Sequence, residues 1–447
     1  PLLFCDKISK TFRDLSKTLN LSNTDFIRTT EKRHINAVQH LWQELKKNDD
    51  IYLSKYSGWY SISDEAFYSD DEIIEKDSFK VSKSSGSKVE WIEEESYFFR
   101  LSKWENKLLQ YYKDNPDFIL PKSRSNEVIS FVKGGLKDLS ISRKAFSWGI
   151  KVPDDNEHVI YVWLDALTNY ISALKYPNLQ DDLYKKFWPA SVHLIGKDIL
   201  RFHAVYWPAF LMAANIPLPK KVYGHGWILS GEEKMSKSKG NILDPLDIIK
   251  TFGLDPLRYY LLKEVSFGND GSISQERLED CINSDLANNY GNLCQRVTAF
   301  AEKNCFCKIP NEVHFNEEDH KILNKFTDNL TNLRESIDNL NINFYINFIV
   351  DSLFEANKYF NDQEPWKKKD DMKRLNTIVY TSLEIIRKIS YMLYPIIPGT
   401  INKSLKIFNL TTDQINFSSI GKHKILKEGD SINKIDILFK KIEKKND

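Results

Sequence analysis

A lysine-rich stretch between positions 230 and 241 holds the side chains best suited to chemistry. It reads Ser-Gly-Glu-Glu-Lys-Met-Ser-Lys-Ser-Lys-Gly-Asn and places the ammonium groups of Lys234, Lys237 and Lys239 among small residues. The stretch lacks apolar periodicity, so neither a buried strand nor an amphipathic helix is expected. Cations carried by a loop can close over negative charge that develops during a reaction. A solvated basic loop without a role is the alternative that this stretch alone leaves open.

The composition indicates an ordinary globular protein of two or three domains. Of the 447 residues, 63 are Lys or Arg and 62 are Asp or Glu, which leaves a net charge of +1. No global field therefore attracts nucleic acid, and any RNA contact must come from local patches. No apolar run is long enough to span a membrane. The five cysteines show no repeated spacing, which predicts free thiols in a reducing, cytoplasmic compartment.

The middle of the chain alternates between predicted strands and predicted helices. Residues 159–164, 191–195 and 221–229 are rich in β-branched and aromatic side chains and predict strands, and residues 165–174 and 198–214 predict helices. This alternation favours an α/β fold with a doubly wound parallel sheet, whose ligands bind beyond the carboxyl ends of the strands. Gly196, Gly226 and the lysine-rich stretch all fall at such ends.

The flanking regions have other patterns. Residues 51–63, paired around Gly58, and 91–100 predict strands, with a surface loop over 69–88, so residues 25–140 predict a small α+β insertion. Asp244 and Asp255 each precede a proline and predict helix N-caps. Helical periodicity between about residues 275 and 408 predicts an α-helical bundle. The lysine-rich tail, 422–447, is predicted to be partly ordered at best.

Several motifs occur in the order found in methionyl-tRNA synthetases, and the chain resembles that family over nearly its whole length. They are Tyr161-Val-Trp-Leu-Asp-Ala, His193-Leu-Ile-Gly-Lys-Asp with Phe202-His203, Gly224-His-Gly-Trp, and Lys234-Met-Ser-Lys-Ser. The resemblance implies a Rossmann-like catalytic domain split by a connective insertion and followed by an anticodon-binding bundle. The implied ranges are 1–24 and 141–240 for the two catalytic halves, 25–140 for the insertion, 241–274 for a linking stem and 275–447 for the bundle.

The resemblance also implies an activity and the residues that carry it. The activity is the ATP-dependent attachment of methionine to its tRNA through a methionyl-adenylate, with Mg²⁺ accompanying ATP. Lys237, and secondarily Lys234, would hold the ATP phosphates. The methionine side chain would contact Trp163, Leu167, Tyr170 and His203. The rest of ATP would contact Gly196, Asp198, His225, Gly226 and Trp227.

In the bundle, Asn292, Arg296, Pro365 and Trp366 resemble the residues with which the family reads the anticodon. Asn292 and Arg296 are one helical turn apart, and a tryptophan beside lysines can stack on an unpaired base. The expected partners are methionine and the initiator and elongator tRNAs for methionine, and the protein is expected to be a monomer. Arg143 stands where the family carries a basic residue, and a plain surface arginine remains the alternative.

Two departures from the family pattern stand out. No His-x-Gly-His motif occurs, so we expect that the natural protein has a further segment before Pro1. Where many members bind zinc through Cys-x-x-Cys pairs, this chain has Ser61 and Asp64, and Ser84 and Ser87 offer no thiolates either. Hydroxyls and one carboxylate make a poor tetrahedral site, which predicts an insertion without zinc.

Other interpretations remain open at this point. A class I synthetase for leucine or cysteine would share the lysine motif, and a non-catalytic tRNA-binding module would explain the missing His-x-Gly-His motif. Taken singly, Trp163 could be ordinary core, His203 a satisfied helix histidine and Asp198 a helix cap.

Overall fold

The computed structural model describes residues 1–64, 66–76, 79–144, 147–231, 233–234, 244–265 and 267–443, with only the backbone of Tyr56, Ala66, Phe67, Glu94, Glu233 and Lys234. Lys237 and Lys239 lie outside the described residues. The chain forms two compact units, Pro1–His225 and Gly226–Asp447. Within the described part of the chain, no helix combines the length and the hydropathy that crossing a bilayer requires.

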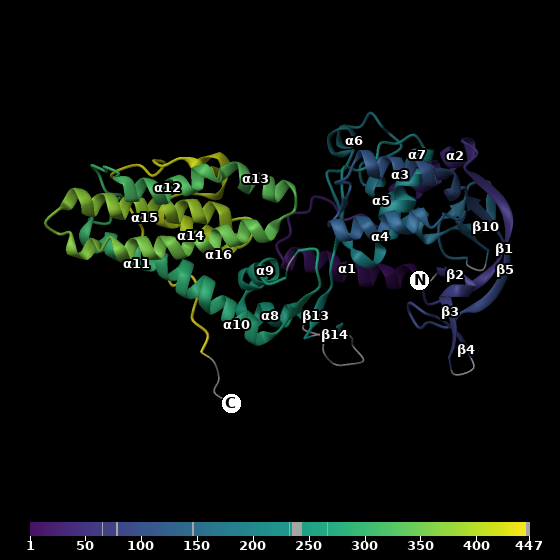
Figure 1. Ribbon diagram of the computed structural model, residues 1–447, viewed down its shortest axis with the longest axis horizontal. Coiled ribbons are helices and arrows are strands. Elements are labelled where there is room, and N and C mark those ends of the chain that lie inside the picture. Colours follow the sequence, from purple (N-terminus) through teal and green to yellow (C-terminus); the bar gives the residue numbers. More distant parts are fainter. Residues whose placement is uncertain are drawn as a thin grey trace. The chain divides into compact units, whose positions relative to one another are not determined.

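A three-stranded parallel sheet lies at the centre of the first unit. Its order is β11 (His193–Gly196), β12 (Val222–His225) and β6 (Ile119–Leu120), and Gly196 pairs with His225. The parallel pairing predicted for the segments at 191–195 and 221–229 is therefore confirmed for β11 and β12. Strand β6 falls inside the range that the sequence assigned to the insertion. Helices α3 (Glu105–Asp114), α4 (Lys122–Lys133), α5 (Val162–Ser172) and α7 (Trp207–Ala213), labelled in Figure 1, share one hydrophobic core with this sheet.

Two strand predictions were wrong in detail. The segment 159–164 does not join the parallel sheet, because β10 (Asp155–Ile160) pairs antiparallel with β8 (Ser142–Arg143) and β9 (Lys151–Val152), and α5 already begins at Val162. The segment 221–229 is interrupted at Gly226–Trp227, after which β13 (Ile228–Ser230) belongs to another sheet. Periodicity cannot separate a short buried strand from the first turn of a buried helix.

The insertion is built on one long antiparallel pair. Strands β1 (Ile51–Ser61) and β5 (Glu90–Phe99) pair without interruption, and Gly58 lies opposite Ile92 inside the ladder rather than at a turn. The predicted surface loop at 69–88 instead contains a hairpin of β3 (Ile73–Lys76) and β4 (Phe79–Ser82). Helix α2 (Lys32–Lys47) buries an apolar stripe of Ala37, Val38, Leu41, Trp42 and Leu45. Helix α1 (Leu2–Thr18) precedes it.

The second unit begins with a small sheet and two helices. The sheet has the order β14 (Glu233–Lys234), β13 and β15 (Gly271–Ile273). Asp244 caps α8 (Pro245–Phe252) as predicted, through a bond from the Leu246 amide at 2.8 Å. The second predicted cap was wrong, since α9 (Leu254–Lys263) starts at Leu254 and the Asp255 carboxylate accepts from the Thr400 amide instead.

The remainder of the second unit is the predicted helical bundle (Figure 1). Helix α15 (Met372–Leu393) has buried side chains on all of its faces, which is typical of a helix at the centre of a core. Its neighbours include α12 (Glu317–Asp328) and α14 (Ile342–Asp362). The bundle also contains α10 (Gln275–Cys281), the π-helical stretch Ile282–Gly291, α11 (Asn292–Asn304), α13 (Leu330–Asp338) and α16 (Pro398–Ser404).

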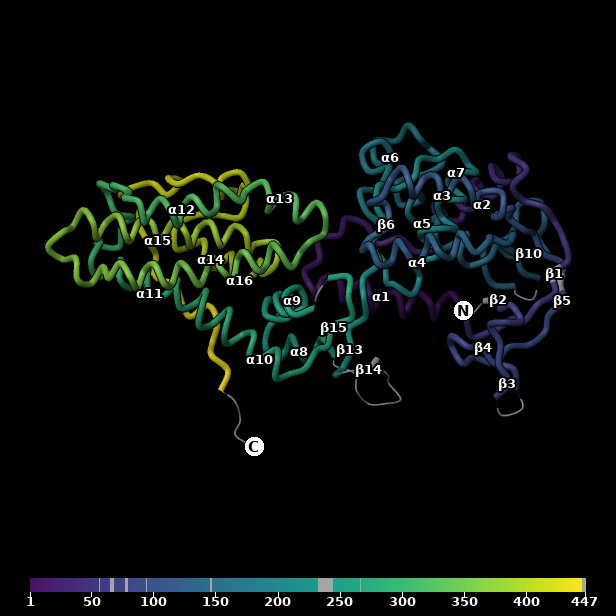
Figure 2. Tube along the Cα trace, viewed as in Figure 1, coloured from purple at the N-terminus to yellow at the C-terminus, as the bar shows by residue number. Residues whose placement is uncertain are grey.

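The C-terminal segment runs along the bundle, in yellow in Figure 2, and is more ordered than the sequence predicted. Arg387 donates to the Ser419 carbonyl, Lys388 donates to the Ile420 and Lys422 carbonyls, and Glu384 accepts from two amides, those of residues 425 and 426. The side chains of Glu384, Arg387 and Lys388, all on α15, are fully buried. This burial, together with the charge of Arg387, lowers the pKa of Lys388 to about 7. The pattern of apolar residues in the sequence could not predict these hydrogen bonds.

Removing the Glu384 carboxylate should destabilise the bundle. Glu384→Gln leaves the guanidinium of Arg387, 2.7 Å away, buried without its counter-charge. We expect the free energy of unfolding in urea to fall by about 3 kcal/mol. The control is Asp338→Asn, which breaks an exposed pair with Arg334 and should change the free energy by less than about 1 kcal/mol. Equal effects of the two substitutions would contradict the prediction.

Candidate active site and anticodon-binding surface

The predicted methionine-binding residues come together in the first unit. Trp163, Leu167 and Tyr170 lie on one face of α5, because their spacings of four and three residues return to the same side of a helix. His203 faces them from a π-helical turn, Phe202–Tyr206. Single π turns inside helices are rare, and where they occur they often lie at functional sites. The four residues therefore form one candidate site.

An aromatic stack forms one side of this site. The ring of Trp163 lies on Phe202, with centroids 3.6 Å apart and planes 10° apart. Trp163 is half-buried, whereas Leu167 is 1% exposed and so belongs mainly to the core. A flat indole surface suits a polarisable thioether. Phe202 belongs to one of the motifs, but its stacking could not be predicted from the sequence.

A directed hydrogen bond forms the opposite side. His203 Nδ1 is 2.9 Å from the carbonyl oxygen of Ile199, which can only accept, so this nitrogen carries the proton. Burial lowers the pKa of His203, which keeps the ring neutral. Nε2 must then accept, and Tyr170 Oη donates to it over 2.8 Å. Burial also raises the pKa of Tyr170 to about 12, so the phenol keeps its proton.

A further histidine packs against the Tyr170 ring, and it was not predicted from the sequence as a site residue. His193, at the start of β11, stacks on the Tyr170 ring with centroids 3.9 Å apart. Its Nε2 accepts from Trp207 Nε1 at 3.2 Å. Burial, with repulsion from His203, lowers the pKa of His193 to about 3, so this ring is also neutral. The sequence feature that could have identified His193 is its position in the His193-Leu-Ile-Gly motif, one strand length before Gly196.

The predicted nucleotide residues of the first unit lie at the carboxyl ends of β11 and β12. Gly196 ends β11 level with His225 on β12. A Cβ atom at Gly196 would come within 2.8 Å of Asp198 Oδ1, so the Asp198 carboxylate lies against the Gly196 backbone. Gly196 is itself the N-cap of the following turn, Lys197–Ile199, which argues against Asp198 as a helix cap.

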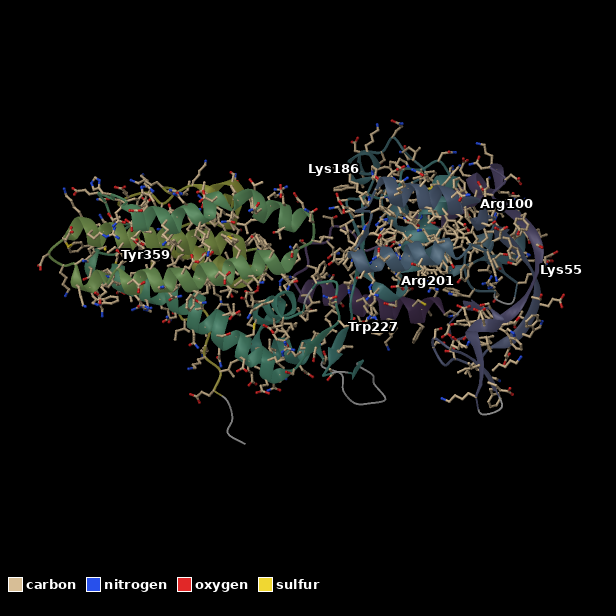
Figure 3. All side chains as sticks on the ribbon, in the orientation of Figure 1. Lys55, Arg100, Lys186, Arg201, Trp227 and Tyr359 are labelled. Carbon is tan, nitrogen blue, oxygen red and sulfur yellow. The ribbon has the colours of Figure 1, made fainter. Side chains whose placement is uncertain are left out.

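The predicted nucleotide residues of the second unit are held by a loop that the sequence did not reveal. A Cβ atom at Gly226 would lie 2.1 Å from the Asn269 carbonyl oxygen, so only glycine fits. The amide of Trp227, labelled in Figure 3, donates to Asp270 Oδ1 at 2.9 Å. The backbone of Lys234, in β14, pairs with that of Leu229 in β13. The lysine-rich stretch thus starts from a paired strand, while Lys237 lies outside the described residues.

Arg143 is a buried residue and not the surface arginine that was the alternative. Its guanidinium lies 4.6 Å from the Tyr161 ring centroid and 5.6 Å from that of Tyr60. Nη1 donates to Ser140 Oγ and to the Ser142 carbonyl, both at 2.7 Å. Cation–π contacts of this kind fix both the arginine and the rings. Arg143 therefore fixes Tyr161, which lies between the strand and α5, two residues before Trp163.

The predicted anticodon residues of the second unit converge through two side chains that the sequence did not single out. Arg296, on α11, donates to Asn361 Oδ1 at 2.5 Å, and its guanidinium is 5.5 Å from the Phe360 ring centroid. Phe360 contacts Trp366 edge to face at 6.2 Å. Trp366 is 41% exposed, so part of its ring is open to a ligand.

The other two predicted anticodon residues flank this group. Asn292 begins α11 one turn before Arg296, directly after the π-helical stretch Ile282–Gly291. Pro365 is buried and starts the short turn Pro365–Lys367 that carries Trp366. The four predicted residues thus occupy the start of α11 and the turn after α14.

The insertion has a hydrogen-bonded carboxylate where a zinc site was considered. Asp64 accepts from Tyr68 Oη and Ser87 Oγ, each at 2.7 Å, and from Ser85 Oγ. Ser61 Oγ accepts from the Asp64 amide. Among the described residues, no group of three or more His, Cys, Asp or Glu side chains could hold a metal ion. The residues present do not fit a zinc site, because their lone pairs and protons are engaged with one another.

Comparisons with protein families define the class. The family model described as "tRNA synthetases class I (M)" matches residues 1–298, and the model described as "Anticodon binding domain of methionyl tRNA ligase" matches residues 309–447. The chain is therefore a class I aminoacyl-tRNA synthetase with an anticodon-binding domain, as the resemblance of its motifs implied.

Individual relatives narrow this class. The chain is 48% identical to methionine–tRNA ligase from Brucella suis over 94% of this chain and 82% of the relative, and 48% identical to that of Rickettsia felis over 99% and 86%. It resembles the structure of Mycobacterium tuberculosis methionyl-tRNA synthetase in complex with methionyl-adenylate with a TM-score of 0.93, 42% identity, and coverage of 97% and 86%.

The chain belongs to the methionyl-tRNA synthetase family. Its activity is the ATP-dependent attachment of methionine to tRNA, and its ligands include methionine, ATP and tRNA. The alternatives of a leucine or cysteine enzyme and of a non-catalytic module are not supported.

The hydrogen bonds at Asp64 should make local stability of the insertion depend on pH. Burial alone would raise the pKa of Asp64, but the hydroxyl donors outweigh it and lower the pKa below its ordinary value. A lowered carboxyl pKa contributes stability above the unfolded value, about 3.9, and loses it as the pH falls through the folded value.

We therefore expect Asp64→Asn to speed amide hydrogen exchange in residues 82–87 at pH 6–7. The ratio of its exchange rate to that of the unsubstituted protein, compared at the same pH, should fall to one towards pH 3. Mass spectrometry measures this ratio, in which the intrinsic pH dependence of exchange cancels. Glu75→Gln, an exposed change on the adjacent β3, serves as control. A ratio that stays constant with pH would refute the role of the carboxylate.

Proposed function

We propose that Trp163, Leu167, Tyr170 and His203 bind the side chain of methionine. The observation that supports this most is the meeting of the Trp163 indole with the Tyr170–His203 hydrogen bond at one place. The aromatic faces provide dispersion contact for a thioether, and the fixed phenol oxygen lets the site distinguish sulfur from a methylene group. His193 and Phe202 keep these groups in position.

We further propose that Gly196, Asp198, His225, Gly226 and Trp227 contact ATP. Asp198 would bond the ribose hydroxyls, and the backbone at Gly196 and Gly226 would approach adenosine, where a side chain would not fit. Such positions, at the ends of parallel strands, are where α/β sheets bind nucleotides. Lys237, with Lys234, would neutralise the β- and γ-phosphates.

The proposed reaction has two steps. A methionine carboxylate oxygen bonds to the α-phosphorus of ATP while the bond from that phosphorus to the bridging oxygen breaks, and pyrophosphate leaves. The terminal ribose hydroxyl of tRNA then attacks the methionyl carbonyl, and AMP leaves. No protein nucleophile is needed, because positioning and charge stabilisation lower the barrier. Mg²⁺ would come with ATP and help to balance the phosphate charge.

The bundle would read the anticodon of both initiator and elongator tRNA. We propose that Trp366, presented by Pro365, stacks on an unpaired base, while Asn292 and Arg296 meet base edges. The half-exposed ring of Trp366 and its neighbouring lysines at 367–369 support this role.

Other features of the enzyme also remain proposals. We propose the domain division 1–24, 25–140, 141–240, 241–274 and 275–447, a monomer, and a cytoplasmic location, which the five free cysteines support. We also propose that the insertion carries no zinc, which one zinc ion per chain in elemental analysis of the purified protein would disprove.

Tyr170→Phe tests the methionine site. Loss of the hydroxyl should raise the KM for methionine about tenfold, equivalent to about 1.4 kcal/mol, with kcat little changed. Discrimination against norleucine, which has a methylene in place of sulfur, should fall. Methionine-dependent pyrophosphate exchange by the full-length enzyme measures both, and Tyr176→Phe, in contact with His40 elsewhere in the unit, is the matched control. An unchanged preference for methionine over norleucine would exclude this role.

Lys237→Ala tests the phosphate assignment. Because the lysine would stabilise charge mainly in the transition state, kcat for pyrophosphate exchange should fall by about 100-fold or more, with methionine affinity little changed. Lys250→Ala, an exposed lysine on α8, is the control and should retain normal exchange. If Lys237→Ala exchanges pyrophosphate at the normal rate, the central role of this lysine is wrong.

A further inference from the structure

The last turn of α14 has two sets of contacts on its two sides. On one side, Phe360 and Asn361 contact Trp366 and Arg296, the candidate anticodon residues. On the other side, Tyr359, labelled in Figure 3, contacts a buried carboxylate that no predicted role includes. Trp366 follows this turn by only a few residues, so contacts that fix the turn also restrict the position of the tryptophan.

The buried carboxylate belongs to Asp319, which is fully buried in the first turn of α12. A capping box fixes it, since Asp319 Oδ2 accepts from the Asn316 amide at 2.9 Å while the Asn316 side chain accepts from the Asp319 amide. Tyr359 Oη also donates to it. The helix N-terminus adds favourable positive potential for this charge. Asp319 is therefore a rigid, charged anchor inside the bundle.

Arg374 connects this anchor to the residues before Trp366. It lies in the first turn of α15 and donates through both Nη atoms to the Asp319 carboxylate. Its Nη2 also donates to Gln363 Oε1 at 2.6 Å. Gln363 is the C-cap of α14, directly before the left-handed Glu364 and the turn Pro365–Lys367. One guanidinium thus ties together α12, α15 and the end of α14.

We propose that Asp319, Arg374 and Gln363 are positioning residues for tRNA recognition, which hold the segment 363–371 so that Trp366 presents its face to an anticodon base. They act without touching tRNA. This inference rests on the anticodon role proposed for Trp366. The planar guanidinium fork is important, because a lysine in its place supplies the charge from a single nitrogen and cannot span both carboxylate oxygens of Asp319 and the amide oxygen of Gln363 with the same geometry.

The turn that carries Trp366 is also held by local backbone hydrogen bonds, from the Lys367 amide to the Glu364 carbonyl at 2.9 Å and from the Lys368 amide to the Pro365 carbonyl at 3.1 Å. Asp371 Oδ1 accepts from the Arg374 amide at 3.0 Å, and the Asp371 amide donates to the Lys368 carbonyl, also at 3.0 Å. Glu364 pairs with Lys367 at the surface, where such pairs contribute little. The Gln363–Arg374 bond therefore closes the base of the segment that carries Trp366.

Steady-state charging of tRNA by the full-length enzyme tests the proposal. Arg374→Lys and Gln363→Met should each raise the KM for tRNA about five- to tenfold, with methionine-dependent pyrophosphate exchange unchanged, because that reaction does not use the anticodon. Gln363→Met leaves the Asp319–Arg374 pair intact, so it keeps the test valid if Arg374→Lys fails to fold. Tyr380→Phe, which removes a buried hydrogen bond from the same helix to Leu426, is the control and should leave the KM for tRNA unchanged.

A double-substitution cycle separates positioning from general stabilisation. If Arg374 acts through Trp366, adding Arg374→Lys or Gln363→Met to Trp366→Ala should raise the KM for tRNA no further than Trp366→Ala alone. Fully additive effects, or a normal KM in both single variants, would overturn the inference while the anticodon role of Trp366 stands. If Trp366→Ala itself leaves the KM unchanged, the anticodon role fails and this inference fails with it.

Discussion

The parallel pairing of β11 with β12 is the constraint on which the catalytic unit depends. Strand β11 has His193 at its start and Gly196 at its end, so one short strand supports both the Tyr170 ring and the turn that is proposed to contact ATP. A slip of one residue would exchange the buried His193 for the exposed Leu194, because neighbouring side chains point to opposite faces. The proposed methionine site and the turn at Gly196 are thereby linked in one rigid element.

Buried polar groups in both units have a defined direction. In the first unit the Ile199 carbonyl decides which nitrogen of His203 carries its proton, and this in turn decides that Tyr170 donates. In the second unit the capping box at Asn316 orients Asp319, which orients Arg374. An apolar core tolerates small shifts, whereas a chain of directed bonds in a medium of low dielectric constant allows one arrangement. Such chains suit the positioning of ligand-binding groups.

The insertion shows another way of joining two loops. Hydroxyl donors from residues 68, 85 and 87 meet at the Asp64 carboxylate, and the Trp59 ring lies edge to face on Trp91 with Lys80 3.9 Å from its centroid. Each contact is weak by itself. Together they connect the end of β1 to the turn after β4, positions that are distant in sequence.

The sequence by itself determined the class of fold, the order of the motifs and the residues that periodicity places on one face. The turn-spaced Asn292 and Arg296, and Leu167 and Tyr170 within the predicted helix 165–174, follow from local spacing, which a helix converts directly into geometry. Trp163, by contrast, fell in a segment predicted as a strand, and only the structure placed it on α5. Only the tertiary structure decided that 159–160 joins an antiparallel sheet, that Gly58 lies within a strand, and that His193 and Phe202 stack on Tyr170 and Trp163. It alone brought Asp319 to Arg374, 55 residues away. Such pairings depend on which distant segments pack together, and no local pattern encodes that choice.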